Sequence, residues 1–123
     1  MAKEYSFEKL TVWQDSRKLV TLIYKLTKLF PSDEVFGLTN QMRRASISIS
    51  SNIAEGSGRT TKRDQANFYK IAYSSMMELL NQLIISKDLN YITDATLANI
   101  RELIDSIASK LSGLRNSLNT SKP

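Results

Sequence analysis

The chain has 123 residues, which is enough for one domain that buries a core without disulfide or metal support. It contains neither Cys nor His, and this excludes disulfides, the usual zinc sites, and catalysis by a Cys nucleophile or a His-activated Ser. The 17 basic residues outnumber the 12 acidic ones, which gives a net charge of +5 and a pI of about 9.6. Such a balance suits a polyanionic partner.

The positive charge is distributed unevenly along the chain. Residues 1–63 hold eleven Lys and Arg against six acids, whereas residues 64–123 hold six of each. The first ten residues are charged and lack an apolar run, so no signal peptide is expected. No apolar stretch approaches the roughly 20 residues that span a bilayer. These features predict a soluble cytoplasmic protein with no membrane association.

Turn-forming segments divide the sequence into four expected helices. The breaks fall near Pro31–Leu38, Ser57–Thr61 and Asn90–Thr93, which leaves helices at about residues 12–30, 40–56, 62–88 and 94–118. A Thr precedes each helix as its expected N-cap: Thr11, Thr39, Thr61 and Thr93. The connections are short, so neighbouring helices should run antiparallel. We predict an all-α protein, a single up-down four-helix bundle over residues 1–123.

The first helix combines a core seam with a basic face. Thr11 and Gln14 have the spacing of a capping box at its start. Spacings of three and four residues, typical of a bundle-facing seam, relate Ser16, Leu19, Ile23, Leu26 and Phe30. The remaining face gathers four cations: Arg17, Lys18, Lys25 and Lys28.

The other three helices differ in how their apolar residues are arranged. The second has one seam, Met42, Ala45, Ile49 and Ile53, and is otherwise rich in Ser and Ala, so packing must hold it. The third has more than one apolar stripe, which indicates a central position or a partner chain. The fourth has an unbroken seam at coiled-coil spacing: Leu97, Ile100, Ile104, Ile107, Leu111, Leu114 and Leu118.

Several ordered blocks resemble a known family. They are Phe7-x-x-Leu10-x-Val12-Trp13-Gln14, Phe30-Pro31, Phe36-Gly37-Leu38-x-x-Gln41-x-Arg43-Arg44-Ala45, Ser48-Ile49-x-x-Asn52-Ile53-Ala54-Glu55-Gly56-x-Gly58-Arg59, and Glu78-Leu79-x-x-Gln82-Leu83. The chain resembles the small bacterial four-helix-bundle proteins encoded in intervening sequences of 23S ribosomal RNA genes. The resemblance covers most of residues 7–91, and the last helix matches only as a pattern.

The resemblance carries expectations about assembly and partners. It implies a left-handed four-helix bundle that associates into a ring-like homo-oligomer, with a pentamer favoured. It also implies an architecture similar to the accessory protein of diversity-generating retroelements, a basic pentameric barrel that binds nucleic acid and a reverse transcriptase. The family brings no established biochemical activity with it.

A polar line on the second helix is the first candidate cluster. Together with Glu78 of the third helix it comprises Gln41, Arg44, Ser48, Asn52 and Glu55. A buried charge needs a partner, so we expect Arg44 to pair with Glu55 or Glu78. The main interpretation is a structural network that fixes helix register or a subunit contact, and the alternative is a ligand contact. Because two carboxylates without His cannot form a di-metal bundle site, no metal, cofactor or catalytic residue is expected.

A basic set is the second candidate cluster. It combines the cations of the first helix with four near the ends of the second and third: Arg17, Lys18, Lys25, Lys28, Arg43, Arg59, Lys62 and Arg63. These residues either bind phosphates or form an ordinary solvated face. No aromatic residues are expected between them to stack on bases. A third group of surplus aromatics either fills the core or forms an interface: Trp13, Tyr24, Phe36, Tyr69 and Tyr73.

Together these features predict a non-enzymatic oligomeric bundle that binds RNA or DNA through its basic surface without sequence specificity. The alternative is a scaffold or adaptor that binds another protein through its helical surface and has no nucleic-acid role. No small-molecule substrate is expected in either case.

Overall fold

The computed structural model of the chain describes residues 2–119, and this part contains four α-helices, two short 3₁₀ helices and no β-strand. The α-helices are α1 (Thr11–Thr27), α2 (Leu38–Ser57), α3 (Lys62–Asp88) and α4 (Asp94–Asn119). The 3₁₀ helix η1 (Ser6–Lys9) precedes α1, and η2 (Ser32–Glu34) lies between α1 and α2. The predicted all-α class and the four-helix bundle are confirmed.

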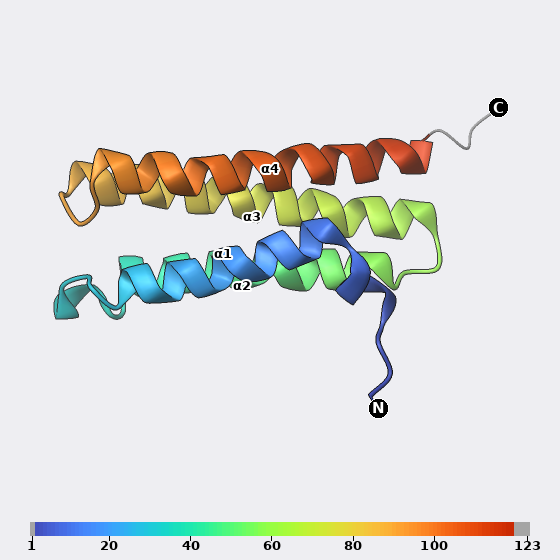
Figure 1. The fold of residues 1–123 in the computed structure, drawn as a ribbon, viewed down its shortest axis with the longest axis horizontal. Helices are drawn as coiled ribbons and strands as arrows, with labels where there is room; N and C mark the ends of the chain where they lie inside the picture. The colour runs from blue at the N-terminus through green and yellow to red at the C-terminus, as the bar shows by residue number, and fades with distance from the viewer. Residues whose placement is uncertain (1, 120–123) are drawn as a thin grey trace.

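The helices lie side by side with connections at alternate ends, as Figure 1 shows. The α1–α2 and α3–α4 connections share one end, which we call the loop end. The α2–α3 connection is at the other, which we call the turn end. α1 packs against α2 and α4, and α3 packs against the same two helices, most extensively against α2.

The core lies between the four helices and follows the predicted seams. Twelve large side chains are fully buried: Leu19, Ile23, Met42, Ile49, Ile53, Met76, Leu79, Leu83, Ile100, Ile104, Ile107 and Leu111. Burial of one such side chain contributes about 1.5–3 kcal/mol to stability. All the fully buried seam positions of α4 were predicted from their spacing. No helix within residues 2–119 has the combined length and apolarity needed to cross a membrane.

The start of α1 differs from the prediction. Thr11 is the first residue of the helix and Leu10 occupies the N-cap position, so Thr11 and Gln14 form no capping box. The Gln14 side chain instead donates to the Glu8 carbonyl at 2.9 Å. A reciprocal cap forms one segment earlier, where Tyr5 N–H donates to the Glu8 carboxylate at 2.6 Å. η1 was not predicted. The side-chain cap therefore lies at the start of η1, and α1 itself has none.

α1 also ends earlier than predicted, at Thr27 and not near Phe30. The amides of Leu29 and Phe30 donate to the carbonyls three residues before them, so the last turn tightens ahead of Pro31. Thr27 Oγ1 donates to the Ile23 carbonyl at 2.7 Å and accepts from Arg43 Nε at 2.9 Å. The contact with Arg43 of α2 stabilises this end of α1. The sequence around Thr27 alone could not predict that contact.

α2 begins two residues earlier than predicted, and Thr39 is not its cap. Gly37 occupies the N-cap position, and the Leu38 amide donates to Glu34 Oε1 at 3.2 Å. Thr39 is buried inside the helix, where its hydroxyl has no hydrogen-bond partner within the described residues. A carboxylate from η2 therefore caps α2 in place of the expected hydroxyl.

The starts of α3 and α4 are as predicted. The Asp64 amide donates to Thr61 Oγ1 at 3.1 Å, and the Thr96 amide donates to Thr93 Oγ1 at 3.1 Å. α2 ends at Ser57 and Gly58 follows it as the C-cap, so the Gly56–Thr61 segment breaks the helix as expected. The predicted bounds of α3 agree with the structure, and those of α4 differ by one residue.

Gly56 lies at a close contact between α2 and α3 near the turn. A Cβ atom added to Gly56 would lie 2.6 Å from Tyr69 Cε1 and 3.0 Å from Phe68 Cβ. Gly113 in α4 has no such neighbour within 4 Å. The absence of a side chain at Gly56 therefore sets the spacing of the two helices at the turn end.

Candidate nucleic-acid interface

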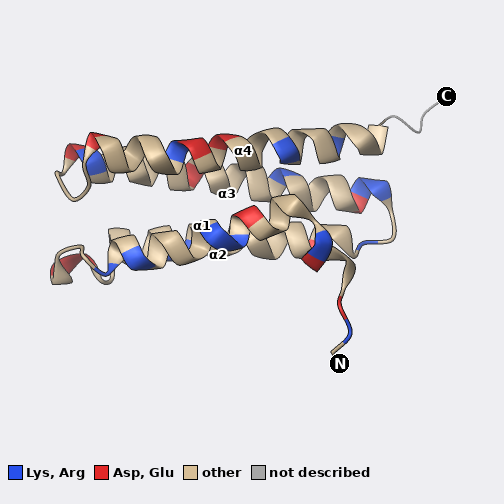
Figure 2. Cartoon of the chain, in the orientation of Figure 1, with Lys and Arg blue, Asp and Glu red and all other residues tan. Residues whose placement is uncertain are grey.

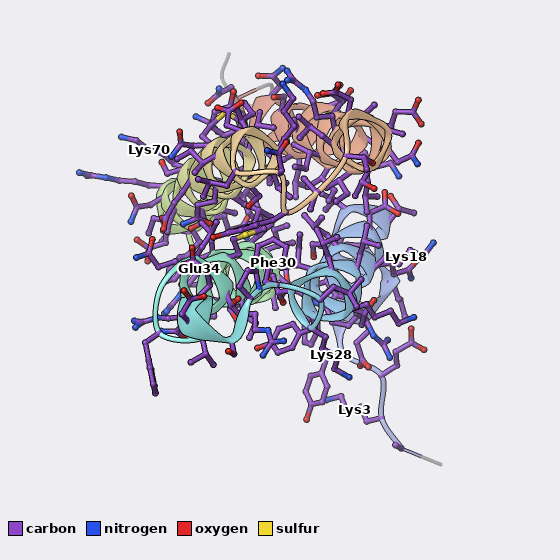
Figure 3. The ribbon with its side chains drawn as sticks, turned by 90° about the vertical axis from the view of Figure 1, so that its left-hand side faces the viewer. Lys3, Lys18, Lys28, Phe30, Glu34 and Lys70 are labelled. Atoms are coloured by element: carbon purple, nitrogen blue, oxygen red, sulfur yellow. The ribbon has the colours of Figure 1, made fainter. Side chains whose placement is uncertain are left out.

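The four basic residues predicted on the first helix form an exposed face of α1. Arg17, Lys18, Lys25 and Lys28 are all exposed. Figure 3, a view along the bundle, labels Lys18 and Lys28 on the α1 side. No salt bridge joins any of the four to a carboxylate within residues 2–119. Their charges are available for solvent or for an anion.

Arg43 belongs to the predicted basic set but has a structural position. It is half-buried, and its Nη2 donates to the Tyr24 carbonyl at 3.4 Å in addition to its bond to Thr27. Its guanidinium lies 4.6 Å from the centre of the Tyr24 ring. A cation at the C-terminal end of α1 also complements the helix dipole. Arg43 therefore ties α2 to the end of α1.

The other three predicted cations gather at the turn end. Arg59, Lys62 and Arg63 are exposed in the α2–α3 connection and the first turn of α3. Arg59 lies 3.9 Å from the Glu55 carboxylate, which is a loose and exposed ion pair. Its guanidinium also lies over the Phe68 ring at 4.5 Å. Of the three, Arg63 has no carboxylate within salt-bridge distance in the described chain.

Aromatic rings accompany several of these cations, contrary to the expectation. Arg17 lies 5.5 Å from the Trp13 ring, and Arg43 and Arg59 stack on Tyr24 and Phe68. None of the three pairs was predicted. Trp13 and Arg17 are four residues apart on α1, so helical periodicity could have indicated that pair, whereas the other two pairs form only when the helices pack. In each pair one face of the aromatic ring is covered by the guanidinium, so that face holds the cation in place and does not stack on a nucleic-acid base.

The structure adds two cations that the sequence analysis did not include. An open pocket of about 380 Å³ between α3 and α4 is lined by Arg63, Asp64, Ala66, Asn67, Lys70 and Arg115. Lys70 follows Arg63 by seven residues, so helical periodicity alone could have placed both on one face. Arg115 comes from α4, and only the packing of α4 on α3 brings it to the pocket.

The charge separates along the bundle when each helix is divided at its midpoint. The turn half (residues 2–19, 48–75 and 107–119) holds ten basic and five acidic residues, a net of +5. The loop half (residues 20–47 and 76–106) holds six basic and seven acidic residues, a net of −1. Figure 2 shows red segments in the α1–α2 connection and at the start of α4, and blue segments around the α2–α3 turn, with some of the opposite colour at each end. The folded molecule therefore has a polarity of charge along the bundle, which differs from the imbalance between the sequence halves because Lys70, Lys110 and Arg115 contribute to the turn half.

The predicted polar network is present only in pieces. Ser48 Oγ and Ser75 Oγ are 2.8 Å apart, and this hydrogen bond joins α2 to α3. Within α2, Asn52 Nδ2 donates to the Ser48 carbonyl at 2.8 Å. Glu78 accepts from Gln82 within α3 at 3.2 Å. Gln41 is exposed and lies outside these bonds.

The predicted ion pair between Arg44 and Glu55 or Glu78 is wrong for the described chain. All three residues are exposed, and Glu55 pairs with Arg59 instead. The α2 core seam passes through Met42, Ala45 and Ile49, which places Arg44 on the outer side of the helix. The expectation of a buried network failed because the helix phase turns Arg43, and not Arg44, toward a neighbouring helix.

The surplus aromatic residues divide between core and surface. Tyr69 is buried in the core, and burial raises its pKa. Trp13 is half-buried and packs edge-on against Phe7, with ring centres 4.9 Å apart. Tyr73 and Phe36 remain exposed, and Phe36 is 93% accessible.

Comparisons with known proteins agree with the fold. A crystal structure of a protein with unknown function from the S23 ribosomal protein family of Bacteroides thetaiotaomicron superposes with a TM-score of 0.79. It is 24% identical, and the match covers 85% of this chain and 98% of that one. No curated protein matches the chain. The profile of the 23S rRNA-intervening sequence protein family matches residues 8–113. The chain therefore belongs to the 23S rRNA-intervening sequence protein family.

Proposed function

We propose that this protein is a non-enzymatic helical bundle that binds the phosphate backbone of RNA or DNA without sequence specificity. The observation that carries the proposal is the basic face of α1, where Arg17, Lys18, Lys25 and Lys28 are exposed and have no salt bridge within residues 2–119. The net charge of +5 in the turn half adds to it. Phosphate contacts need accessible cations but no precise geometry, and the exposed Lys and Arg of α1 and the α2–α3 turn meet that need. No cofactor, metal or small-molecule substrate enters the proposal.

We propose further that the chain is an up-down, left-handed bundle that assembles into a closed cytoplasmic homo-oligomer, with a pentamer favoured by the family resemblance. Exposed apolar side chains on α3 support self-association: Ile71, Tyr73, Met77, Ile84 and Ile85. Several copies around one axis would add their basic patches into a stronger field. Light scattering at micromolar concentration tests the assembly, and a monomer would contradict it.

The binding proposal is tested by titrating a labelled single-stranded RNA and a DNA duplex at about 50 and 200 mM salt. Wild-type affinity should fall steeply between the two salts because counterions are released on binding. Reversal of Lys18, Lys25 and Lys28 to Glu should weaken binding for every sequence alike. In an oligomer the loss should exceed that expected for one chain, since the copies act together.

A matched control reverses Arg44, Lys87 and Arg101, which changes the net charge equally at positions outside the α1 face. This control should retain most of the affinity, because local phosphate contacts and not net charge determine binding. No wild-type binding at the lower salt would refute the proposal. Equal losses in both triple variants would reduce it to a general charge effect.

A second function, that of a protein-binding adaptor, is favoured by a different surface. Leu29, Val35 and Phe36 at the loop end are exposed by 83%, 50% and 93%. Large apolar side chains in this arrangement suit a protein partner. If nucleic acid does not bind, substitution of Phe36 by Ser followed by pull-down of partners is the next experiment.

A further inference from the structure

The pocket between α3 and α4 is a concentration of unpaired positive charge. Arg63 and Lys70 come from the first three turns of α3, and Arg115 comes from the last turns of α4. Asp64 is the one carboxylate among the lining residues. None of the three cations has a salt bridge within residues 2–119. Three like charges around one open pocket repel one another unless an anion lies between them.

The chemistry of the pocket suits phosphate. Asn67 adds a neutral donor to the three cations, and Ala66 leaves space in the wall because its side chain is small. Arg115 is half-buried, so its position is restricted more than that of a free surface arginine. The first turn of α3 also directs the positive end of a 27-residue helix toward this region. These features act in the same direction, toward an anionic ligand.

The spacing of the cations favours a strand over a single ion. Seven residues of α-helix separate Arg63 from Lys70, which corresponds to about 10 Å along the axis. Cations spread over that distance match successive phosphates along a backbone better than one free anion. We propose that this pocket is a second phosphate-binding site for nucleic acid, in which Arg63, Lys70 and Arg115 contact neighbouring phosphates of one strand. The inference rests on the proposed function.

The site is separate from the basic face of α1. In the view along the bundle, Lys70 and Lys18 lie on opposite sides (Figure 3). The α2–α3 turn, with Arg59 and Lys62, lies at the same end as the pocket. Variants of the pocket can therefore be compared with variants of α1, because a substitution on one surface can weaken binding there without affecting the other.

The test is the affinity of the full chain for a labelled single-stranded oligonucleotide across salt concentrations. Lys70→Gln combined with Arg115→Gln should lower affinity about tenfold or more at low salt and reduce the salt slope by about 1 per lost contact. Arg101→Gln is the matched control, because Arg101 is an exposed cation on α4 in the loop half. Arg101→Gln should leave both affinity and slope unchanged. Circular dichroism melts verify that each variant is folded.

The outcomes separate the inference from the function on which it rests. Wild-type affinity in the Lys70/Arg115 variant, alongside weakened binding by the α1 reversal, would overturn the pocket alone. Equal losses in Arg101→Gln and Arg115→Gln would also overturn it. If inorganic phosphate binds to the wild type and not to the Lys70/Arg115 variant while both bind the oligonucleotide equally, the pocket is a free-anion site and the strand assignment is wrong. Absence of wild-type binding would remove both proposals.

Discussion

The two ends of the bundle are held together by different means. At the turn end α2 and α3 meet through close backbone packing, with Gly56 against the Tyr69 ring, and Arg63, Lys70 and Arg115 have no salt bridge within residues 2–119. At the loop end side chains tie the segments: Arg43 bonds to Thr27, and Tyr91 Oη donates to the Glu34 carboxylate at 2.8 Å. The hydrogen bond between Tyr91 and Glu34 joins the α3–α4 connection to the α1–α2 connection.

The comparison shows how charge is used in each region. In the loop half several charged groups have structural partners: Glu34 caps α2 and bonds to Tyr91, and Lys87 pairs with Asp94 at 3.6 Å. Lys25, Lys28, Arg44 and Arg101 of the same half are exposed and have no salt bridge within residues 2–119. In the turn half Lys110 pairs with Asp15, Arg59 lies loosely near Glu55 and Glu8 caps η1. Arg63, Lys70 and Arg115 have no salt bridge within residues 2–119. Charge that is not needed for folding is free to serve binding.

The largest expected effect concerns the packing of the turn end. Gly56→Ala should lower the free energy of unfolding by about 1–3 kcal/mol, because the new methyl group would overlap the Tyr69 ring and the Phe68 Cβ. Gly113→Ala is the matched control and should raise stability by about 0.5–1 kcal/mol, since nothing surrounds that site and alanine favours the helix. Urea unfolding measures both. A stabilising Gly56→Ala would mean that the helices are not in close contact there.

The loop end is tested through its arginine. Arg43→Gln should lower the free energy of unfolding by about 1–2 kcal/mol, because the half-buried contacts with Thr27 and the Tyr24 carbonyl are lost. Arg43→Lys should recover only part of this, since an ammonium cannot make both contacts and stack on the ring. Arg44→Gln, on the next residue, should change stability by less than about 0.5 kcal/mol because its side chain is exposed.

The pair Arg43 and Arg44 also shows what the sequence could and could not predict. The seam of α4 and the caps Thr61 and Thr93 were predictable because local spacing determines them. Which of two adjacent arginines turns inward depends on a rotation of about 100° per residue and on where α1 lies. The α1 end at Thr27 depends on the same tertiary contact and was missed for that reason.

The candidate site divides in the same way. The basic face of α1 was readable from one helix, and the structure confirms that its residues are exposed. The pocket of Arg63, Lys70 and Arg115 required knowledge of how α4 packs on α3. A polar residue that acts through a neighbouring helix is invisible to periodicity, which describes only the faces of single helices.

A smaller effect is expected at alkaline pH from the bond across the loop end. The hydrogen bond to Glu34 raises the pKa of Tyr91 above its usual value of 10.0, with further contributions from burial and from the charges of Glu34 and Asp33. The folded state thus holds the Tyr91 proton more tightly than the unfolded state. This contribution is complete below pH 10.0 and is lost as the pH rises through the folded-state pKa.

Urea unfolding at about pH 8 and about pH 11 measures this contribution. Wild-type stability should fall more over that range than the stability of Tyr91→Phe. Glu34→Gln should reproduce the shallower decline, although it also removes the cap of α2. Tyr69 supplies the contrast at the turn end, because burial and not a carboxylate raises its pKa. A Glu34 variant with the full wild-type decline would contradict the assigned cause.

The smallest expected effect is a pair of changes in the free energy of unfolding that should have opposite signs at the two ends of the bundle. Arg115→Gln and Lys87→Gln remove one positive charge each, so the net charge changes equally. Arg115 lies in a pocket with two other cations and no salt bridge within the described chain, whereas Lys87 lies near Asp88 and Asp94. Neutralising Arg115 should raise the free energy of unfolding, and neutralising Lys87 should lower it, each by about 0.2–0.5 kcal/mol.

Both differences should shrink near 1 M salt, where the Debye length falls to about 3 Å. Urea unfolding at low and high salt, with protein concentration held constant, provides the measurement. Changes of the same sign would mean that net charge and not local environment sets the stability of both ends. If Arg115→Gln is more stable and also binds oligonucleotide more weakly, the turn end gives up stability to retain an unpaired cation. That combination is expected of a binding site and not of a surface that is merely solvated.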